Sequence, residues 1–362
     1  MGEQRRGVSG ITLRDIGEKR LIAEYIRPLF NPSGLNEGVG NDCALLTMND
    51  DVCVCASTDR VPADLVSFKL GLINFRQLGQ YLAVLNISDI AAAGGEPRAL
   101  LLNLAFPPDF AVSDLNDFLL GAKEAGDHYG APVLGGDLSD AVEMNLVATS
   151  LGVIRQQQAI FRSGARPGNK VFCSDYLGVT PTAFLHYLYR GAITHAELSL
   201  DQEAVLTSNF RRPIARVGLG RQLAMGGYCT AMMDVTDGVA QSFAEIAASS
   251  SVGIVLDTER LPIHPVSRAL AAHYDRDVVR VILGPGADFQ LVGTLDLTHA
   301  ACAQLPEEVR LIGEVIEGSG VYLRSRDGEV NAFAPEGWNY YAESQQQTSE
   351  AGASVGAVPT TS

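Results

Sequence analysis

Apolar residues recur at helical spacing in two amphipathic segments of the chain. The pattern predicts one helix over residues 17–30 and a second over residues 113–130. In the second helix, Ser113 is expected to cap the first turn and Gly130 to end the last turn. A third segment, residues 84–97, is nearly all apolar or small, which predicts a buried helix.

Short apolar runs that end in turn residues predict strands between these helices. Residues 40–59 are expected to form two strands, and further strands are expected within residues 131–137, 143–154 and 228–239. Cys53 and Cys55 alternate along one of these strands, so both thiols should point to one buried face. The mixture of strands and helices predicts an α/β (α+β) fold.

The length of the chain, 362 residues, exceeds what one hydrophobic core usually supports, so two domains are expected. The composition becomes loop-like around residues 153–168. The predicted organisation is an N-terminal tail at 1–16, an N-terminal domain at 17–153, a C-terminal domain at 154–342 and a disordered tail at 343–362.

The chain carries a formal net charge of −15, from 42 acidic and 27 basic residues. This balance argues against a nucleic acid as partner, because phosphate backbones bind basic surfaces. The longest apolar runs are much shorter than the roughly 20 residues of a membrane span. The first ten residues lack the apolar core of a secretory signal. A cytoplasmic protein that contacts no membrane is therefore expected.

Several aspartates lie at the end of a predicted strand or inside an apolar helix, where solubility does not require them. They are Asp42, Asp59, Asp89, Asp137, Asp234 and Asp237. A single aspartate at such a place is usually a helix cap or a turn residue. Ligand sites of α/β proteins form at strand ends, so this set is expected to converge.

Converging carboxylates need counter-charges, since two unit charges about 4 Å apart repel by roughly 4 kcal/mol at an effective dielectric of about 20. Oxygen ligands without histidine or cysteine favour Mg²⁺, Mn²⁺ or Ca²⁺ over zinc. Substrate phosphates commonly supply some of the ligands of a protein-bound Mg²⁺. Gly136 and Gly238 beside the aspartates would let phosphate oxygens approach backbone N–H groups. The pattern therefore indicates nucleotide chemistry, although the P-loop and dinucleotide fingerprints are missing.

Eight collinear motifs resemble those of the bacterial thiamine-monophosphate kinase family. They read GEKRLI, GNDCALL, STD, NISDIAAAGGEP, LGGD, RSGARPGN, MDVTDGV and GPGADFQLVGT, and with their flanks they cover roughly residues 17–341. That family belongs to the superfamily of aminoimidazole-ribonucleotide synthetase and selenophosphate synthetase. The resemblance implies a two-domain fold in which N-terminal strands of two subunits form a barrel across a homodimer, with ATP and several Mg²⁺ ions bound between the domains.

The resemblance also implies roles for individual residues of this sequence. Metal ligands would be Asp42, Ser57, Thr58, Asp59, Asp89, Asp137, Asp234 and Asp237, with Asp42, Asp89 and Asp237 central to catalysis. Contacts to ATP would come from Gly136, Asp137, Arg162 and Thr236. The implied reaction is direct in-line transfer of the γ-phosphoryl group, in which metals supply most of the charge neutralisation.

The departures from the family pattern concentrate on the residues that would face the acceptor substrate. Asn41 precedes Asp42 where the family has an aspartate. Ser67 stands in place of a histidine, and Ala287 replaces a glutamate beside the retained Asp288. Trp338 lies one to three positions out of register with the family's terminal tryptophan. Ser67, Ala287, Asp288 and Trp338 are the candidate substrate residues.

These departures favour a kinase that phosphorylates a small molecule other than thiamine monophosphate, since a lost hydrogen-bonding group removes discrimination. Three alternatives stay open. The chain could be a thiamine-monophosphate kinase with a drifted pocket that makes thiamine diphosphate. It could be a cyclo-ligase that activates a carbonyl oxygen with ATP, or a nucleotide-binding protein without turnover.

Overall fold

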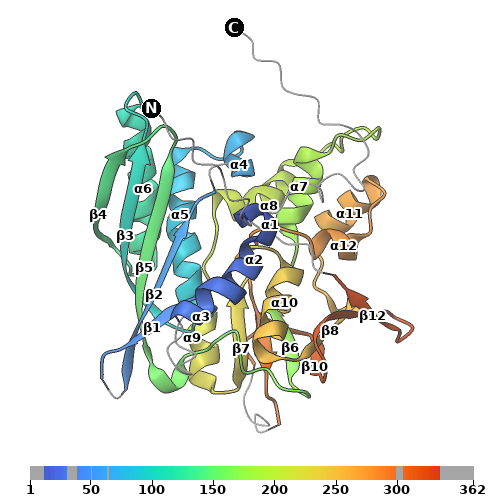
Figure 1. Cartoon of the computed structure of the whole chain (residues 1–362). Helices are drawn as coiled ribbons and strands as arrows, with labels where there is room; N and C mark the ends of the chain where they lie inside the picture. Colours follow the sequence, from blue (N-terminus) through green and yellow to red (C-terminus); the bar gives the residue numbers. More distant parts are fainter. Residues whose placement is uncertain (1–11, 31–38, 50, 63–64, 299–304, 335–362) are drawn as a thin grey trace, which may run out of the picture.

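The computed structural model describes residues 12–30, 39–49, 51–62, 65–298 and 305–334. Two sheets with their helices build a mixed α/β fold, as predicted (Figure 1). The first sheet ends at Arg155 and the second begins at Lys170, while the exact domain limits stay a prediction. The tail at 343–362 lies outside the described residues, and Leu13–Ile16 of the expected N-terminal tail form the short helix α1.

The N-terminal sheet has five strands in the order β1-β2-β5-β3-β4. Their bounds are β1 Ala44–Thr47, β2 Val52–Arg60, β3 Glu96–Phe106, β4 Val133–Asp140 and β5 Asn145–Arg155. β3 and β4 pair in parallel and the other neighbours pair antiparallel. Two long helices, α5 (Phe75–Ala92) and α6 (Val112–His128), cover one face of this sheet. The predicted hairpin of residues 40–59 is thereby confirmed as β1 and β2.

The second sheet has seven strands in the order β12-β11-β8-β10-β6-β9-β7. Its strands are β6 Lys170–Ser174, β7 Cys229–Asp234, β8 Gly253–Asp257, β9 Leu291–Leu295, β10 Val309–Ile316, β11 Gly320–Arg324 and β12 Val330–Phe333. The longer helices of this half are α7 Val179–Leu188, α8 Leu200–Arg211, α9 Val217–Gly226, α10 Val239–Ser250 and α11 Pro265–His273, followed by the short α12 Val278–Ile282. Among the strands of this sheet, β7 ends at the predicted site residue Asp234.

The predicted helix over residues 17–30 is present as three consecutive helical segments. They are α2 (Glu18–Leu21), a π-helical turn (Ile22–Ile26) and α3 (Arg27–Phe30). This stretch passes beside α10, as the ion pair of Lys19 with Glu245 shows (Figure 1). The N-terminal helix therefore reaches elements of the second half of the chain.

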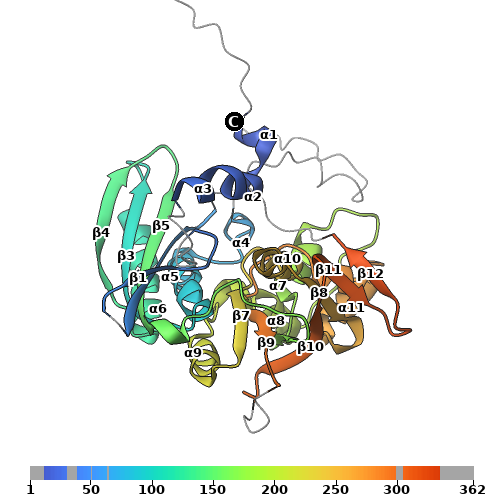
Figure 2. The same ribbon diagram turned by 60° about the horizontal axis from the view of Figure 1, so that its bottom comes forward.

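Helix α5 is buried along nearly its whole length, which explains its almost continuous apolar sequence. A reciprocal capping box starts it, with the Asn74 side chain accepting from the Gln77 N–H at 3.0 Å and the Gln77 side chain accepting from the Asn74 N–H at 3.0 Å. A Cβ on Gly79 would lie 2.0 Å from the Phe118 carbonyl oxygen, so glycine lets α5 approach α6 closely. Figure 2 shows α5 between the two sheets.

The start of α6 differs from the sequence prediction. The helix begins at Val112 with Ala111 as its N-cap, and no side chain caps it. Ser113 therefore lies inside the first turn rather than at the cap, because the N-cap is Ala111, two residues before the predicted one. Gly130 follows the end of α6 with a φ of 68°, as a helix-terminating glycine does.

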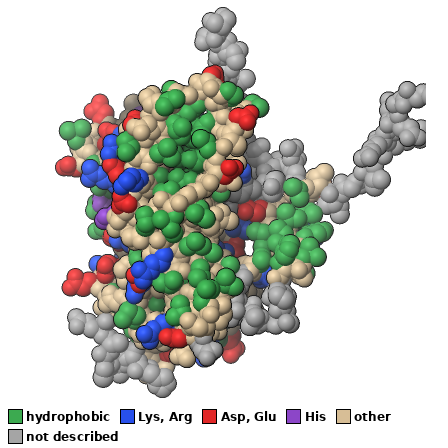
Figure 3. Space-filling view, turned by 90° about the vertical axis from the view of Figure 1, so that its left-hand side faces the viewer, with side chains coloured by type: hydrophobic (Ala, Val, Ile, Leu, Met, Phe, Trp, Pro, Cys, Tyr) green, Lys and Arg blue, Asp and Glu red, His purple; other side chains and the backbone are tan. Residues whose placement is uncertain are grey.

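The outer face of the N-terminal sheet carries exposed apolar side chains (Figure 3). Leu46 pairs with Val54 across β1 and β2, and Leu101 of β3 pairs with Thr149 of β5 on the same face. Leu46 is 64% exposed. Cys53 and Cys55 point to the opposite, buried face, as predicted. None of the helices in the described ranges has the length and apolar character needed to cross a membrane.

Candidate active site

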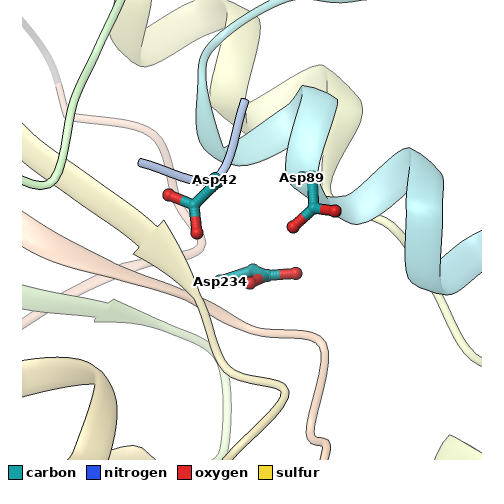
Figure 4. Close-up of side chains that lie close together, drawn as sticks. All are labelled: Asp42, Asp89 and Asp234. Carbon is teal, nitrogen blue, oxygen red and sulfur yellow. The ribbon is translucent and has the colours of Figure 1, made fainter. Parts of the chain in front are cut away.

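Three carboxylates from distant parts of the chain meet between the two sheets. Asp42 lies just before β1, Asp89 lies on α5 and Asp234 is the last residue of β7. Figure 4 shows that their side chains point toward one another. One oxygen atom of each lies within 4.8 Å of an oxygen of the other two. We call these three residues the carboxylate site.

The carboxylate site is buried, and its charges are not balanced by protein groups alone. Burial, followed by the charges of neighbouring aspartates, raises the pKa of Asp89 and of Asp234 well above the ordinary value. The Oδ2 atom of Asp234 has no partner of good hydrogen-bond geometry among the described residues, and the Ser88 hydroxyl acts only to lower the pKa of Asp234. Two unit charges at such a separation repel by about 3 kcal/mol at an effective dielectric of about 20. A bound cation would remove this repulsion.

Two further predicted ligands extend the carboxylate site along β2. The Ser57 hydroxyl donates a hydrogen bond to Oδ2 of Asp89 at 2.6 Å. The backbone N–H of Asp59 donates to the Asn86 side chain at 2.9 Å, and that side chain donates in turn to the Leu82 carbonyl oxygen. Burial, then the charge of Asp237, raises the pKa of the Asp59 carboxyl to about 7. These contacts fix β2 against α5 at the site.

Two basic side chains balance part of the negative charge. Arg162 donates from Nη2 and Nε to Oδ1 of Asp42, at 2.7 and 3.2 Å, and its backbone N–H donates to the Asn41 side chain. Lys19 lies 3.0 Å from Oδ2 of Asp237. Although burial acts to lower it, the pKa of Lys19 is raised by Asp237 and by Glu245.

The other residues expected to bind metal or ATP do not all lie at the carboxylate site. Thr236 lies beside Asp237 on the turn between β7 and α10. The Thr58 side chain points to the outer face of the sheet, where it donates to the Ala148 carbonyl oxygen. Gly136 and Asp137 lie exposed on β4, which β5 and β3 separate from β2 by three strand spacings, about 14 Å. Metal and ATP binding by these residues stays a prediction.

Gly136 has a structural requirement of its own. Its φ is 151°, and a Cβ at this position would lie 1.7 Å from the Leu102 carbonyl oxygen of the neighbouring strand. Close pairing of β4 with β3 therefore demands glycine here, whether or not a phosphate approaches its N–H group.

The candidate acceptor residues are buried in the described structure. Ser67 on the short helix α4 (Val66–Lys69) is 1% exposed, and its hydroxyl has no partner among the described residues. Ala287 belongs to the apolar cluster against which Phe68 packs. Trp338 lies outside the described residues. Substrate contacts by these residues stay a prediction.

Asp288 has a structural role that accounts for its retention. Its carboxylate accepts hydrogen bonds from the backbone N–H of Gly178, from the backbone N–H of Thr180 at 2.8 Å, and from the Asn209 amide at 3.1 Å. The Asp288 carboxylate thus connects the start of α7 to the loop that precedes β9. Burial raises the pKa of Asp288 to about 6, although these hydrogen bonds act to lower it.

Some residues of the site were not singled out from the sequence. Lys19 lies inside the motif GEKRLI, so it was within a matched segment. Glu245 lies on α10 outside any matched motif and is brought in only by the fold. A lone glutamate on an amphipathic helix gives no signal of such a contact.

The carboxylate site suits a divalent cation by its donor set. All its ligands are oxygens, they come from rigid elements, and one buried oxygen is without a hydrogen bond. Such oxygens could share Mg²⁺ with the phosphates of a nucleotide, and Arg162 stands beside them as a fixed positive charge.

Comparisons with known proteins agree with this fold and site. Residues 40–154 match the family AIR synthase related protein, N-terminal domain. The thiamine-monophosphate kinase of Bacillus subtilis is 30% identical over 85% of this chain and 94% of its own length. That of Halobacterium salinarum is 31% identical over 89% of this chain and its full length. The structure of AaThiL complexed with AMPPCP and TMP is 25% identical, has a TM-score of 0.77, and is matched over 92% of this chain and 99% of that one.

Fold and carboxylate site thus define an ATP-dependent phosphotransferase of the class related to AIR synthase. The extent of the match narrows the class further. The chain belongs to the thiamine-monophosphate kinase family.

Proposed function

We propose that this chain transfers the γ-phosphoryl group of ATP to thiamine monophosphate, with Mg²⁺, to give thiamine diphosphate. The buried carboxylate site with its unpartnered Asp234 oxygen carries the proposal, because it is suited to the cation that such a nucleotide brings. The named relatives that match along almost their whole length are thiamine-monophosphate kinases, and one similar structure contains AMPPCP and TMP.

The departures at Ser67 and Ala287 led to the expectation of a different acceptor. The comparisons support thiamine monophosphate better, since relatives with that activity match over the segments that contain both positions. The contacts of Asp288 support the same reading in part, because a carboxylate held by three protein donors is retained for the fold. The presence of Asp288 therefore gives no evidence for an acceptor other than thiamine monophosphate.

The residues of this chain would divide the work as follows. The carboxylate site would hold Mg²⁺, which supplies charge neutralisation to the phosphates when bound. The Arg162 guanidinium is held in one orientation by its two hydrogen bonds to Asp42, while the Asn41 side chain accepts from the Arg162 backbone N–H. The acceptor is already a phosphate, and its oxygen needs no base to remove a proton at neutral pH. Positioning and electrostatics then carry most of the rate enhancement.

We also infer that the protein acts as a homodimer. The outer face of the N-terminal sheet exposes apolar side chains, Leu46 and Leu101 among them, that a second copy would cover. Asp137 lies on β4, three strand spacings from β2 of its own chain, so we expect it to serve the site of the second copy. Light scattering should give twice the chain mass, and Leu46→Asp should shift it toward the monomer. A monomeric wild type would contradict this inference.

The activity is tested by incubating the purified protein with ATP, Mg²⁺ and thiamine monophosphate, and measuring thiamine diphosphate by chromatography. Reactions with EDTA, or with thiamine as acceptor, serve as controls. Stable phosphorylated product in the complete mixture alone supports the proposal. Free phosphate with a dehydrated product would indicate a cyclo-ligase, and absence of ATP consumption with every acceptor would indicate a nucleotide-binding protein without turnover.

A further inference from the structure

Lys19 makes a contact at the active site with residues that are distant in the sequence. Its ammonium group lies 3.0 Å from Oδ2 of Asp237 and 3.4 Å from Oε1 of Glu245 on α10. The side chains of Lys19 and Asp237 are 32% and 38% exposed, so the pair faces solvent rather than a closed core. The contact is thus accessible to an incoming ligand.

The two partners of Lys19 differ in what a metal-bound nucleotide would do to them. Asp237 adjoins the carboxylate site, and its charge acts on Asp59. A divalent cation on Asp237 would repel an ammonium group about 4 Å away by several kcal/mol at an effective dielectric of about 20. Glu245 lies outside the carboxylate site and can keep Lys19 nearby. The flexible lysine side chain therefore stays at the site while it loses one partner.

We propose that Lys19 is a further phosphate-binding residue of this active site: on binding of the metal–nucleotide complex, its ammonium group leaves Asp237 and pairs with the polyphosphate. This inference rests on the proposed function. A lysine suits the task because its compact charge has three rotatable donors, and lysine is a common ligand of phosphate. Once Asp237 pairs with the metal, the polyphosphate replaces it as the negatively charged partner of Lys19.

The test is the affinity of AMPPCP with Mg²⁺, measured by calorimetry without acceptor, for Lys19→Met, Lys19→Arg and the control Arg20→Met. Arg20 lies on the same helix, is exposed, and pairs with Glu24 at 2.7 Å, away from Asp237. Lys19→Met should raise the Kd about tenfold or more, as expected for the loss of a hydrogen bond between charged groups. Lys19→Arg should recover part of the affinity, and Arg20→Met should stay within about twofold of wild type.

A second readout separates phosphate binding from a structural role. The affinity for AMP, which lacks the outer phosphates, should change little in Lys19→Met. Thermal unfolding without ligand establishes that each variant is folded, and Lys19→Gln replaces Lys19→Met if the latter does not fold. An equal loss for AMP and AMPPCP, or unchanged AMPPCP affinity, would overturn the inference.

The outcome is independent of the acceptor. If the wild type binds AMPPCP but makes no thiamine diphosphate, the assigned acceptor is wrong and the Lys19 result still decides the inference. If the wild type does not bind AMPPCP with Mg²⁺, the proposed function and the Lys19 assignment both fail.

Discussion

Asp234 and Asp288 are two fully buried aspartates of the same half of the chain, each 1% exposed. Both oxygens of Asp288 accept hydrogen bonds from protein donors, and burial raises its pKa only to about 6. Asp234 has one oxygen without a partner and Asp42 and Asp89 as neighbours, and its pKa is raised to about 8 by burial and then by Asp42. The comparison teaches that a satisfied carboxylate serves the fold, whereas an unsatisfied one in a like-charged group is suited to a cation.

The largest expected effect is that of Asp234→Asn on turnover. The amide removes a negative charge from the carboxylate site, and kcat/KM should fall by at least about a hundredfold, as for other losses of preorganised electrostatic groups. The free energy of unfolding of the metal-free protein should stay equal or rise, because a buried repulsion is relieved. Steady-state kinetics and denaturant unfolding measure the two. Strong destabilisation with intact turnover would contradict the comparison.

Asp288→Asn should show the opposite behaviour. The amide loses one of the acceptor oxygens that hold the start of α7, so the free energy of unfolding should drop by about 1–3 kcal/mol. Affinity for AMPPCP with Mg²⁺ should stay near that of the wild type at a temperature where the variant is folded. Urea unfolding and calorimetry test both parts. Unchanged stability with a specific loss of thiamine monophosphate binding would instead place Asp288 in the substrate pocket.

The smallest effect concerns pH. The folded pKa values of Asp59 and Asp234 lie above the ordinary value of 3.8, at about 7 and about 8. The folded state therefore binds these protons more tightly than the unfolded state. The resulting stability is complete below pH 3.8 and is lost as the pH rises through the folded values. The melting temperature of the metal-free protein should decline between about pH 5 and pH 8 from this contribution.

Matched conditions isolate this contribution. Mg²⁺ with AMPPCP should flatten the decline, because the cation replaces the protons as counter-charge, and Asp234→Asn should flatten it without ligand. Differential scanning calorimetry across the pH range provides the measurement. A slope that is the same in Asp234→Asn and in the wild type would show that other groups cause it.

The sequence predicted the elements and residues whose chemistry is local. The hairpin of β1 and β2 follows from short apolar runs that end in turn residues, and the buried helix at Asp89 follows from a segment of apolar and small residues. The aspartates of the carboxylate site follow from carboxylates placed where solubility does not require them. Ser113 was misassigned because a two-residue shift of the N-cap leaves the periodic pattern of the helix unchanged.

What the sequence left open depends on contacts between distant segments. Lys19 and Glu245 come together across more than two hundred positions, and neither stands out among other surface charges. The replacements at Ser67 and Ala287 suggested a new acceptor, but two single replacements do not reveal how the surrounding side chains repack. Both positions are buried.

The burial of α5 has a consequence for dividing the molecule. The helix packs against the N-terminal sheet, α6, α8, α9 and β7, and its core cluster includes Leu206, Phe210 and Phe289 of the second half. A fragment cut near Arg155 would leave one side of α5 in water and would be expected to aggregate rather than fold alone. The two halves of this enzyme should consequently unfold together, in a single cooperative transition.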